Sequence, residues 1–520
     1  MDPDLTQEAA EVAEAAELEA GAAAASGRAA GPSDQRLIVG QTGQNVLGLA
    51  IGAAATFVAQ VVMSNALGGD AFGVVTIATQ FAFVAAAATR FGMDVANVRL
   101  VAILIGRGQG GRVPGLVRRS AGIALAVSVP FAVVAFLAAP WLAGLHALPD
   151  LAEPAFRWAA VTVPFAALAF TAMGATRGMK IMRYTLFAQW ITQPIGWIVL
   201  TLALWAVASR TAGWASAGFA LSWAAALGVA WAGWRWERGR LPGTIDGEGI
   251  AEERAGALWR FGALRAPGTL FSQLIFWTDL FVLSWLVSGE GAAGATDVGV
   301  YSGVLRAGQS LFLFLTSVSL TFSPFVADLH HRGERARLDG LYKQVTRWTL
   351  AATIPVLLVL VVLPADVLRI FGEDFAAGDG ALRILAAGMI VPVMVGTVGF
   401  ILIMAGRTGW DLVVYLGGFV LDVGLALALA RPEALGIRGA AIAQAATLTA
   451  SAVARLLLVR RFLGIWPFDR AYARLVVPTA FAAAAMAAVH ALLDDAAWAV
   501  DLVGSSVAGL AVYGAAMLAV

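Results

Sequence analysis

The chain has 520 residues, of which 60% are hydrophobic and only 13% are charged, and its formal net charge is +1. An ordinary soluble domain carries about 25% charged residues, so this composition excludes a soluble globular protein and indicates an all-α polytopic membrane protein. The sequence has no cysteine, which excludes disulfides and thiolate metal sites.

The first 36 residues form a separate acidic segment. Up to Asp34 they carry eight acidic side chains and one arginine, without a long apolar run. A signal peptide needs a basic region followed by an apolar region, so the segment does not predict one. The composition predicts a disordered acidic tail on the cytoplasmic side.

Apolar segments separated by polar turns follow, and they predict fourteen transmembrane helices. The expected spans lie near residues 38–64, 72–92, 117–143, 156–176, 184–208, 213–233, 267–288, 298–325, 347–364, 382–404, 410–430, 437–459, 474–492 and 498–520.

The basic residues orient these spans. With the N-terminus in the cytoplasm, the cytoplasmic loops and the adjoining helix ends hold 28 of the 35 lysines and arginines, whereas the outer loops hold six. Positive residues concentrate on the cytoplasmic side of membrane proteins. The distribution predicts a multi-pass protein of the cytoplasmic membrane with both termini in the cytoplasm.

The cytoplasmic loop at 328–347 combines five basic residues with apolar residues at helical spacing, namely Leu338, Leu341 and Val345. This pattern predicts a helix that lies on anionic lipid headgroups.

Two parts of the sequence resemble one another. The segments "VVMSNALGGDAFGVV" and "FVLSWLVSGEGAAGATDVGVY" align Gly73 with Gly299 and place Gln80 on Arg306. Transporters are often built from two repeated lobes with the substrate site between them. The expected parts are an N-lobe at 37–235 (spans 1–6), a cytoplasmic linker at 236–257, a C-lobe at 258–465 (spans 7–12) and two added helices at 466–520.

Five stretches resemble, in order, the polysaccharide and oligosaccharide-lipid flippases of the multidrug/oligosaccharidyl-lipid/polysaccharide exporter (MOP) superfamily. They are "ALGGDAFGVVTIATQFAFVAAAATRFGMDVANVRLVA", "LRAPGTLFSQLIFWTDLFVLSWLVSG", "VGVYSGVLRAGQSL", "FGEDFAAGDGALRILAAG" and "GIRGAAIAQAATL". Each is a loose pattern, but five in order within fourteen spans are fairly specific. The resemblance implies a V-shaped pair of lobes, alternating access and outward movement of a polyprenyl-pyrophosphate-linked glycan. Composition and periodicity indicate only a two-lobed transporter.

Arg306 lies eight residues into the eighth predicted span, about 12 Å from its outer end at 1.5 Å of rise per residue. A charge at that depth costs at least about 2.5–3.5 kcal/mol on the insertion scale. Asp279, on the seventh span, is expected at a similar depth. One interpretation is a structural ion pair between them. The other is that Arg306 binds the substrate pyrophosphate in the cavity, because a guanidinium fork matches phosphate oxygens.

Three glutamines within the spans are candidates for binding sugar hydroxyls in the cavity: Gln80, Gln273 and Gln309. Hydrogen bonds between helices would account for them as well.

Three arginines at cytoplasmic helix ends are candidates for an entrance that collects the diphosphate headgroup: Arg90, Arg99 and Arg265. Arg90 and Arg99 flank Asp94. Ordinary positive-inside anchoring would explain these arginines equally well.

Asp422 departs from the family pattern, which usually has an uncharged polar residue in the eleventh span. At that depth a carboxylate is expected to be protonated or paired, so Asp422 is a candidate for energy coupling.

Other function classes fit less well. No outer loop carries paired carboxylates beside a histidine, so we expect no enzyme, and neither a cofactor nor a metal; His330 and His331 lack further ligands. A lipid II flippase and a multidrug or cation antiporter of the same superfamily remain alternatives. The expected partners are the lipid-linked glycan, membrane lipids and the polymerase or glycosyltransferases of the pathway, and not nucleic acid.

Overall fold

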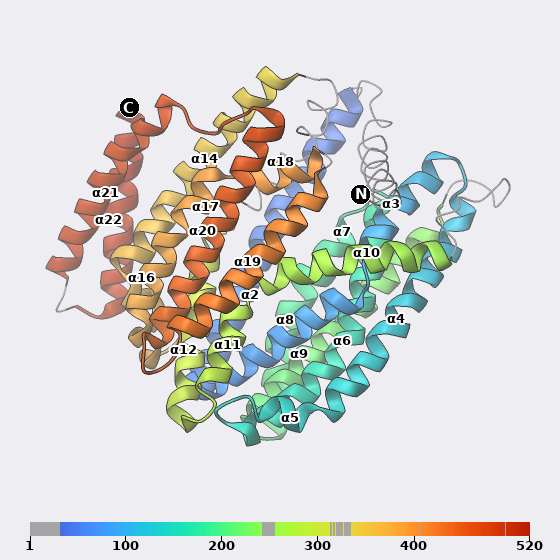
Figure 1. The fold of residues 1–520 in the computed structure, drawn as a ribbon, viewed down its shortest axis with the longest axis horizontal. Helices are drawn as coiled ribbons and strands as arrows, with labels where there is room; N and C mark the ends of the chain where they lie inside the picture. Colours follow the sequence, from blue (N-terminus) through green and yellow to red (C-terminus); the bar gives the residue numbers. More distant parts are fainter. Residues whose placement is uncertain are drawn as a thin grey trace, which may run out of the picture. The chain divides into compact units, whose positions relative to one another are not determined.

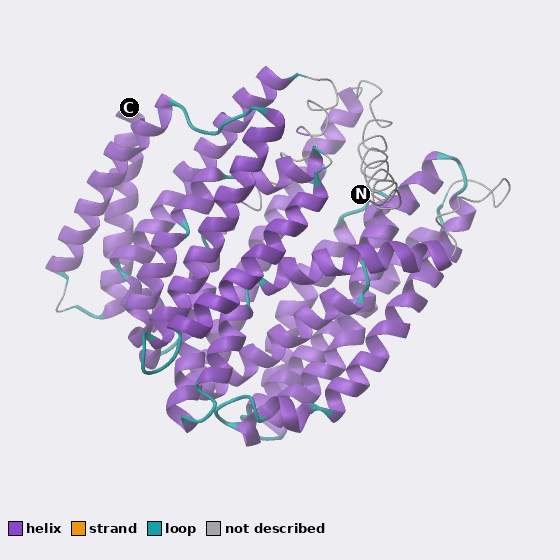
Figure 2. Ribbon diagram, in the orientation of Figure 1, coloured by secondary structure: helices purple, strands orange, loops and turns teal. Residues whose placement is uncertain are grey.

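The computed structural model describes residues 32–241, 255–312, 334–405, 407–493 and 496–519, with positions 315, 318 and 326. For residues 32–50 it describes the backbone alone. The described chain is helical and contains no strand (Figure 2). Most of the predicted acidic tail and of the predicted linker lie outside the described residues, and so do His330 and His331.

The chain divides into two compact units, each of which contacts mainly itself. They are Asp34–Gly299, called here the N-unit, and Val300–Val520, called the C-unit. The division falls inside helix α12 (Gly291–Gln309). The lobes at 37–235 and 258–465 rest on the sequence repeat and remain a prediction.

The N-unit contains the helices up to the first half of α12 (Figure 1). They are α2 (Pro32–Thr89), α3 (Met93–Gly106), η1 (Gly110–Arg112), α4 (Val113–Leu137), α5 (Ala139–Ala143), α6 (Pro149–Gly178), α7 (Arg183–Thr185), η2 (Leu186–Thr192), α8 (Gln193–Val207), α9 (Ala212–Arg238), α10 (Ala255–Leu274) and α11 (Thr278–Leu286).

Helix α6 is central to the packing of the N-unit, where it contacts α3, α4 and α9. Gly174 and Gly178 form a Gly-x-x-x-Gly pair on α6, and a Cβ atom at Gly174 would lie 2.9 Å from the Cα atom of Asp94 in α3. The amide of Asn97 in α3 donates a hydrogen bond to the backbone oxygen of Thr171 (3.0 Å). Small residues and buried amide bonds are the usual means of joining helices in lipid, where no hydrophobic force drives them together.

The C-unit continues α12 and contains the later helices. They are α14 (Arg335–Val362), α15 (Pro364–Arg369), η4 (Glu373–Gly378), α16 (Asp379–Gly388), α17 (Ile390–Val395), α18 (Val398–Met404), α19 (Thr408–Leu429), α20 (Gly436–Leu463), η5 (Arg470–Leu475), α21 (Val476–Leu492) and α22 (Trp498–Ala519). Within this unit α19 packs on α20, and α21 and α22 run side by side (Figure 1).

The start of α14 corrects one prediction. Leu338 and Val345 are buried in a core cluster with residues of α17, α18 and α20, instead of facing lipid headgroups. On the same side of α14, the hydroxyl of Tyr342 donates to the backbone oxygen of Val395 (2.7 Å). The helix forms as predicted, but protein covers its apolar side, because apolar residues at helical spacing can pack on protein as well as on a membrane surface.

A multi-pass membrane protein is confirmed, but the count of fourteen spans is not. Among the described residues, eleven helices are long and apolar enough to cross a membrane, or twelve if α10 and α11 form one bent span. Two features account for the lower number. Helix α2 includes both of the first two predicted spans and continues through a non-helical kink at Gly68 (φ 79°, ψ 172°). Most of the eighth predicted span beyond residue 312 lies outside the described residues.

Candidate functional site

Arg306 lies in the last turn of α12, in the part that belongs to the C-unit, and its neighbours Leu305 and Ala307 are buried. The glycines of α12 lie against other helices: a Cβ atom at Gly308 would lie 2.8 Å from the side chain of Leu385 in α16. Gly308 lies two residues after Arg306 and on another face, whereas Gly303, three residues before it, shares its face, and a Cβ atom at Gly303 would lie 2.8 Å from the Phe375 ring. Gln309, one turn further on, shares the face of Arg306.

The remaining candidates for the cavity belong to the N-unit. Asp279 is fully buried in the first turn of α11, after a 61° bend between α10 and α11. A carboxylate in a first turn interacts favourably with the free amides of the helix N-terminus. Gln273 is half-buried near the end of α10, and Gln80 is buried in α2. Because Asp279 and Arg306 lie in different units, their pairing stays a prediction.

The predicted entrance contains a cluster of charges within the N-unit. The Nε atom of Arg90 lies 3.4 Å from Asp94 Oδ1, and Nη2 of Arg177 lies 4.0 Å from Asp94 Oδ2. The guanidinium of Arg90 also lies 4.6 Å from the centre of the Phe170 ring. Two arginines therefore face one carboxylate here, and both Arg90 and Asp94 are largely shielded from solvent.

The turn between α2 and α3 places Arg265 beside this cluster. Phe91 and Gly92 both adopt left-handed backbone conformations (φ 55° and 67°). A Cβ atom at Gly92 would lie 3.1 Å from the side chain of Arg265 in α10, and the Phe91 ring packs edge-on against Trp259 (5.0 Å). Arg99 lies further along α3, five residues after Asp94. The side chain of Arg265 thus packs on this turn, and its role in an entrance stays a prediction.

Asp422 is fully buried in α19 and accepts a hydrogen bond from the Thr447 hydroxyl of α20 (3.3 Å). The sequence had offered no partner for this carboxylate. Thr447 is itself fully buried, so the two residues form part of a polar contact between α19 and α20 inside the C-unit.

A second charge contact between α19 and α20 was not predicted. The Nε atom of Arg455 donates to Asp411 Oδ1 (2.7 Å), and the guanidinium lies 4.4 Å from the centre of the Tyr415 ring. Breaking such a buried pair by removing one partner costs about 3–5 kcal/mol. We assign this pair to holding α19 against α20, because both side chains are shielded and directed at one another.

Sequence comparisons identify two families. Residues 41–330 match the family described as "Polysaccharide biosynthesis protein", and residues 269–428 match the MatE family. A comparison with curated protein sequences finds no match.

Several solved structures share the fold. The lipid II flippase MurJ, in an inward closed conformation, has a TM-score of 0.66 at 13% identity, over 90% of this chain and 97% of its own. An inward-facing multidrug resistance MATE family transporter of the MOP superfamily has a TM-score of 0.63 at 16% identity, over 81% and 94%. The MATE multidrug transporter DinF-BH has a TM-score of 0.61 at 18% identity, over 84% and 97%. At these identities the likeness establishes the fold.

The family match extends over more than half of the chain, and the proteins that share the fold are flippases and transporters. The resemblance to a polysaccharide family that the sequence showed is confirmed by this match, and the fold is the one seen in MurJ and in MATE transporters. The chain belongs to the polysaccharide biosynthesis protein family.

Proposed function

We propose that the protein flips a polyprenyl-pyrophosphate-linked oligosaccharide from the inner to the outer leaflet of the cytoplasmic membrane, for assembly of a cell-surface polysaccharide. The family match supports a role in polysaccharide synthesis, and MurJ, with the same fold, is a flippase for lipid II. The single observation that carries the proposal is Arg306, a guanidinium among buried apolar residues of α12. Ionisable residues within membrane helices usually mark a substrate or ion pathway.

The cavity residues have distinct roles in this proposal. Arg306 binds the pyrophosphate through its planar fork of donors, which remains charged at any relevant pH. Asp279 holds the guanidinium when the cavity is empty. Gln80, Gln273 and Gln309 donate and accept hydrogen bonds with sugar hydroxyls.

The cluster at the turn between α2 and α3 forms the cytoplasmic entrance. Arg90 and Arg177 converge on Asp94, and Arg265 packs beside the same turn. A diphosphate that approaches carries more negative charge than the single carboxylate, so it competes for both guanidinium groups. Arg99 extends the basic surface along α3.

Asp422 is the proposed coupling residue. It is fully buried in α19 and accepts a hydrogen bond from Thr447, and ionisable residues inside membrane helices often belong to proton or ion pathways. Its presence favours one alternative, a multidrug or cation antiporter, and the likeness to MurJ favours the other, a lipid II flippase.

Transport by the purified protein separates these three functions. Vesicles that contain the full chain should translocate a fluorescent polyprenyl-pyrophosphate oligosaccharide, measured as the fraction of label accessible to an external quencher. Lipid II and a cationic dye serve as the competing substrates in matched vesicles. Faster translocation of lipid II would favour that flippase, and dye movement driven by a proton or sodium gradient without glycan transport would contradict the proposal.

The membrane orientation belongs to the proposal and has its own test. Reporter domains inserted at 288–290, just before α12, should be active outside the cytoplasm, and those inserted at 328–333, before α14, should be active inside, because basic residues concentrate on the inner side. An alkaline phosphatase and a fluorescent protein reporter at each position provide opposite signals. The reverse pattern would refute the orientation and the depth assigned to Arg306.

A further inference from the structure

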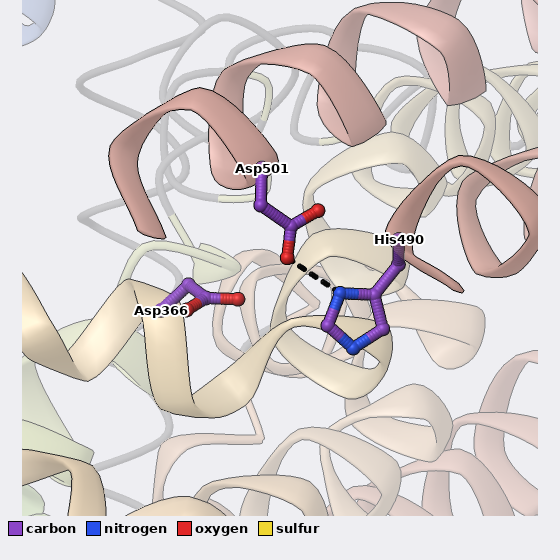
Figure 3. A group of neighbouring side chains, drawn as sticks. All are labelled: Asp366, His490 and Asp501. Carbon is purple, nitrogen blue, oxygen red and sulfur yellow. Dashed lines mark hydrogen bonds and ion pairs between the residues drawn. The ribbon is translucent and has the colours of Figure 1, made fainter. Parts of the chain in front are cut away.

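Three side chains in the C-unit meet at the end of the helix pair α21–α22. Asp366 comes from α15, His490 from the last turn of α21 and Asp501 from the first turn of α22. One potential ligand atom from each residue lies within 4.8 Å of the other two. Figure 3 shows both carboxylates and the imidazole directed toward a common point, with Nδ1 of His490 2.5 Å from Asp501 Oδ2.

The outer contacts of the two carboxylates orient them toward that point. Arg369 Nη1 donates to Asp366 Oδ1 (2.7 Å), and the hydroxyl of Ser505 donates to Asp501 Oδ1 (2.8 Å). The Oδ1 atom of each aspartate is thereby held by a hydrogen bond, and the carboxylates are directed toward the point that they share with His490. Ligands of metal ions are typically held in this way by hydrogen bonds from residues behind them.

The charge of the cluster favours a cation. Asp366 and Asp501 are 5% and 4% exposed, so two carboxylates are buried side by side. Arg369 is shared between Asp366 and Glu373, whose Oε2 atom lies 3.6 Å from its Nε atom. The positive charge of Arg369 is therefore divided between Asp366 and Glu373. It does not pair with Asp501. Buried charges in proteins are paired or bind metal ions, because leaving them uncompensated is costly.

We propose that Asp366, His490 and Asp501 bind a divalent cation of the Zn²⁺ class, with water completing the coordination. The kinds of ligand atom in the cluster, one imidazole nitrogen and carboxylate oxygens, indicate which ions it would bind. Imidazole nitrogen is a good ligand for Zn²⁺, whereas Mg²⁺ and Ca²⁺ prefer all-oxygen sites. On binding, the ion takes the place of the hydrogen between His490 Nδ1 and Asp501 Oδ2, which leaves to solvent as a proton, and Asp366 supplies the third ligand.

The ion joins the C-terminal helix pair to the rest of the C-unit. Only five residues, 493–497, separate α21 from α22, and α15 precedes η4 and α16 in the body of the unit. A metal held by all three helices fixes the end of the α21–α22 pair against α15. With the predicted orientation, this end of the pair lies on the outer side of the membrane. This inference does not depend on the substrate of the transporter.

Metal binding should be measured on the full-length protein carrying an affinity tag without histidine. We expect one Zn²⁺ per chain, competed away by a chromogenic chelator, and weaker binding of Mg²⁺ and Ca²⁺. His490→Ala and Asp501→Asn should each weaken Zn²⁺ binding by about a hundredfold or more, and Ser505→Ala by about tenfold to a hundredfold, the range typical of an outer hydrogen bond. Zn²⁺ should raise the unfolding temperature of the parent protein and leave that of His490→Ala unchanged.

The absence of cysteine from the chain allows a direct spectroscopic test. His490→Cys replaces the imidazole by a thiolate, another good ligand for these metals. With Co²⁺ as the probe, this variant should show a thiolate-to-cobalt charge-transfer band. Ala491→Cys, which places the thiol one residue away, should not show it. The band should also disappear when Asp501→Asn is combined with His490→Cys.

The other histidines provide the control. Burial lowers the pKa of His146 to about 4, and its Nδ1 atom accepts the amide hydrogen of Leu148 (3.1 Å). His330 and His331 are the remaining pair, so a variant with both replaced by alanine should retain Zn²⁺ binding. Loss of binding in that variant, or retention in His490→Ala, would overturn the proposal. Absence of stoichiometric binding to the parent protein would show that His490 and Asp501 form a hydrogen bond only.

Discussion

Replacing Arg306 by lysine should lower glycan export by roughly tenfold or more, although lysine keeps the positive charge. A lysine ammonium is a compact point charge and cannot make the two parallel hydrogen bonds that a guanidinium makes with a phosphate. A hydrogen bond to a charged group contributes about 1.5–3 kcal/mol, which corresponds to a factor of about ten to 150. Arg306→Ala removes both hydrogen bonds and the charge, so export should fall below detection. Surface polysaccharide and protein level should be measured in the same cells.

A double substitution separates substrate binding from a structural ion pair. Asp279→Asn with Arg306→Gln replaces both charges by neutral groups that still form hydrogen bonds. If the residues only stabilise the fold, expression and export should recover together, because a buried pair can be replaced without loss when both partners are changed. If Arg306 binds pyrophosphate, expression recovers while export stays lost. Recovery of export in the double variant would refute the binding role.

A matched arginine controls for general effects of substitution. Arg337 in α14 is exposed, and its Nη1 atom lies 3.2 Å from Glu334 Oε2. Exposed ion pairs of this kind contribute about 0–1 kcal/mol, so Arg337→Lys and Arg337→Ala should leave both export and expression close to the parent level.

The helical, membrane-spanning nature of the chain could be predicted because it depends on composition and local periodicity. The number of spans was harder to predict. Between residues 64 and 72 the sequence predicts the end of one span and the start of another, and the backbone is non-helical at Gly68, although α2 as a whole extends from Pro32 to Thr89. The packing of Leu338 and Val345 also could not be predicted, since their spacing shows that they share a face but not what covers it.

Arg306 could be singled out from the sequence because a charged residue inside an apolar span is rare. A contact between two charged residues far apart in the sequence could not be predicted in this way. Asp411 and Arg455 are 44 residues apart, and each was consistent with a helix end near the membrane surface. Their contact depends on the register between α19 and α20, which a single sequence does not contain. His490 and Asp501 are the exception. Only a few residues separate the end of one apolar helix from the start of the next, so this contact could have been inferred from the sequence spacing alone.

Helix α2 and helix α12 approach each other closely where both carry glycine, at Gly69 and Gly73 of α2 and at Gly299 of α12. A Cβ atom at Gly299 would overlap the backbone oxygen of Gly69, and one at Gly73 would lie 2.8 Å from the backbone nitrogen of Gly299. The obstacles are backbone atoms, which cannot rotate away as a side chain can. The sequence alignment that predicted the repeat pairs Gly73 with Gly299, the two glycines of this contact, but the repeat itself stays a prediction.

Gly299→Ala should therefore destabilise the N-unit strongly, even though alanine is the better helix former. The added methyl group forces α2 and α12 apart by about 1 Å or more, and overpacking of this kind typically costs about 1–3 kcal/mol and occasionally more. We expect a lower unfolding temperature in detergent and a reduced yield of monodisperse protein, with Gly299→Leu worse than Gly299→Ala. Gly228 in α9 is the matched control, because a Cβ atom there would meet no atom within 4 Å. Gly228→Ala should be neutral or should stabilise the protein by up to about 1 kcal/mol through helix propensity. Equal stability of the two alanine variants would mean that α2 and α12 do not approach this closely.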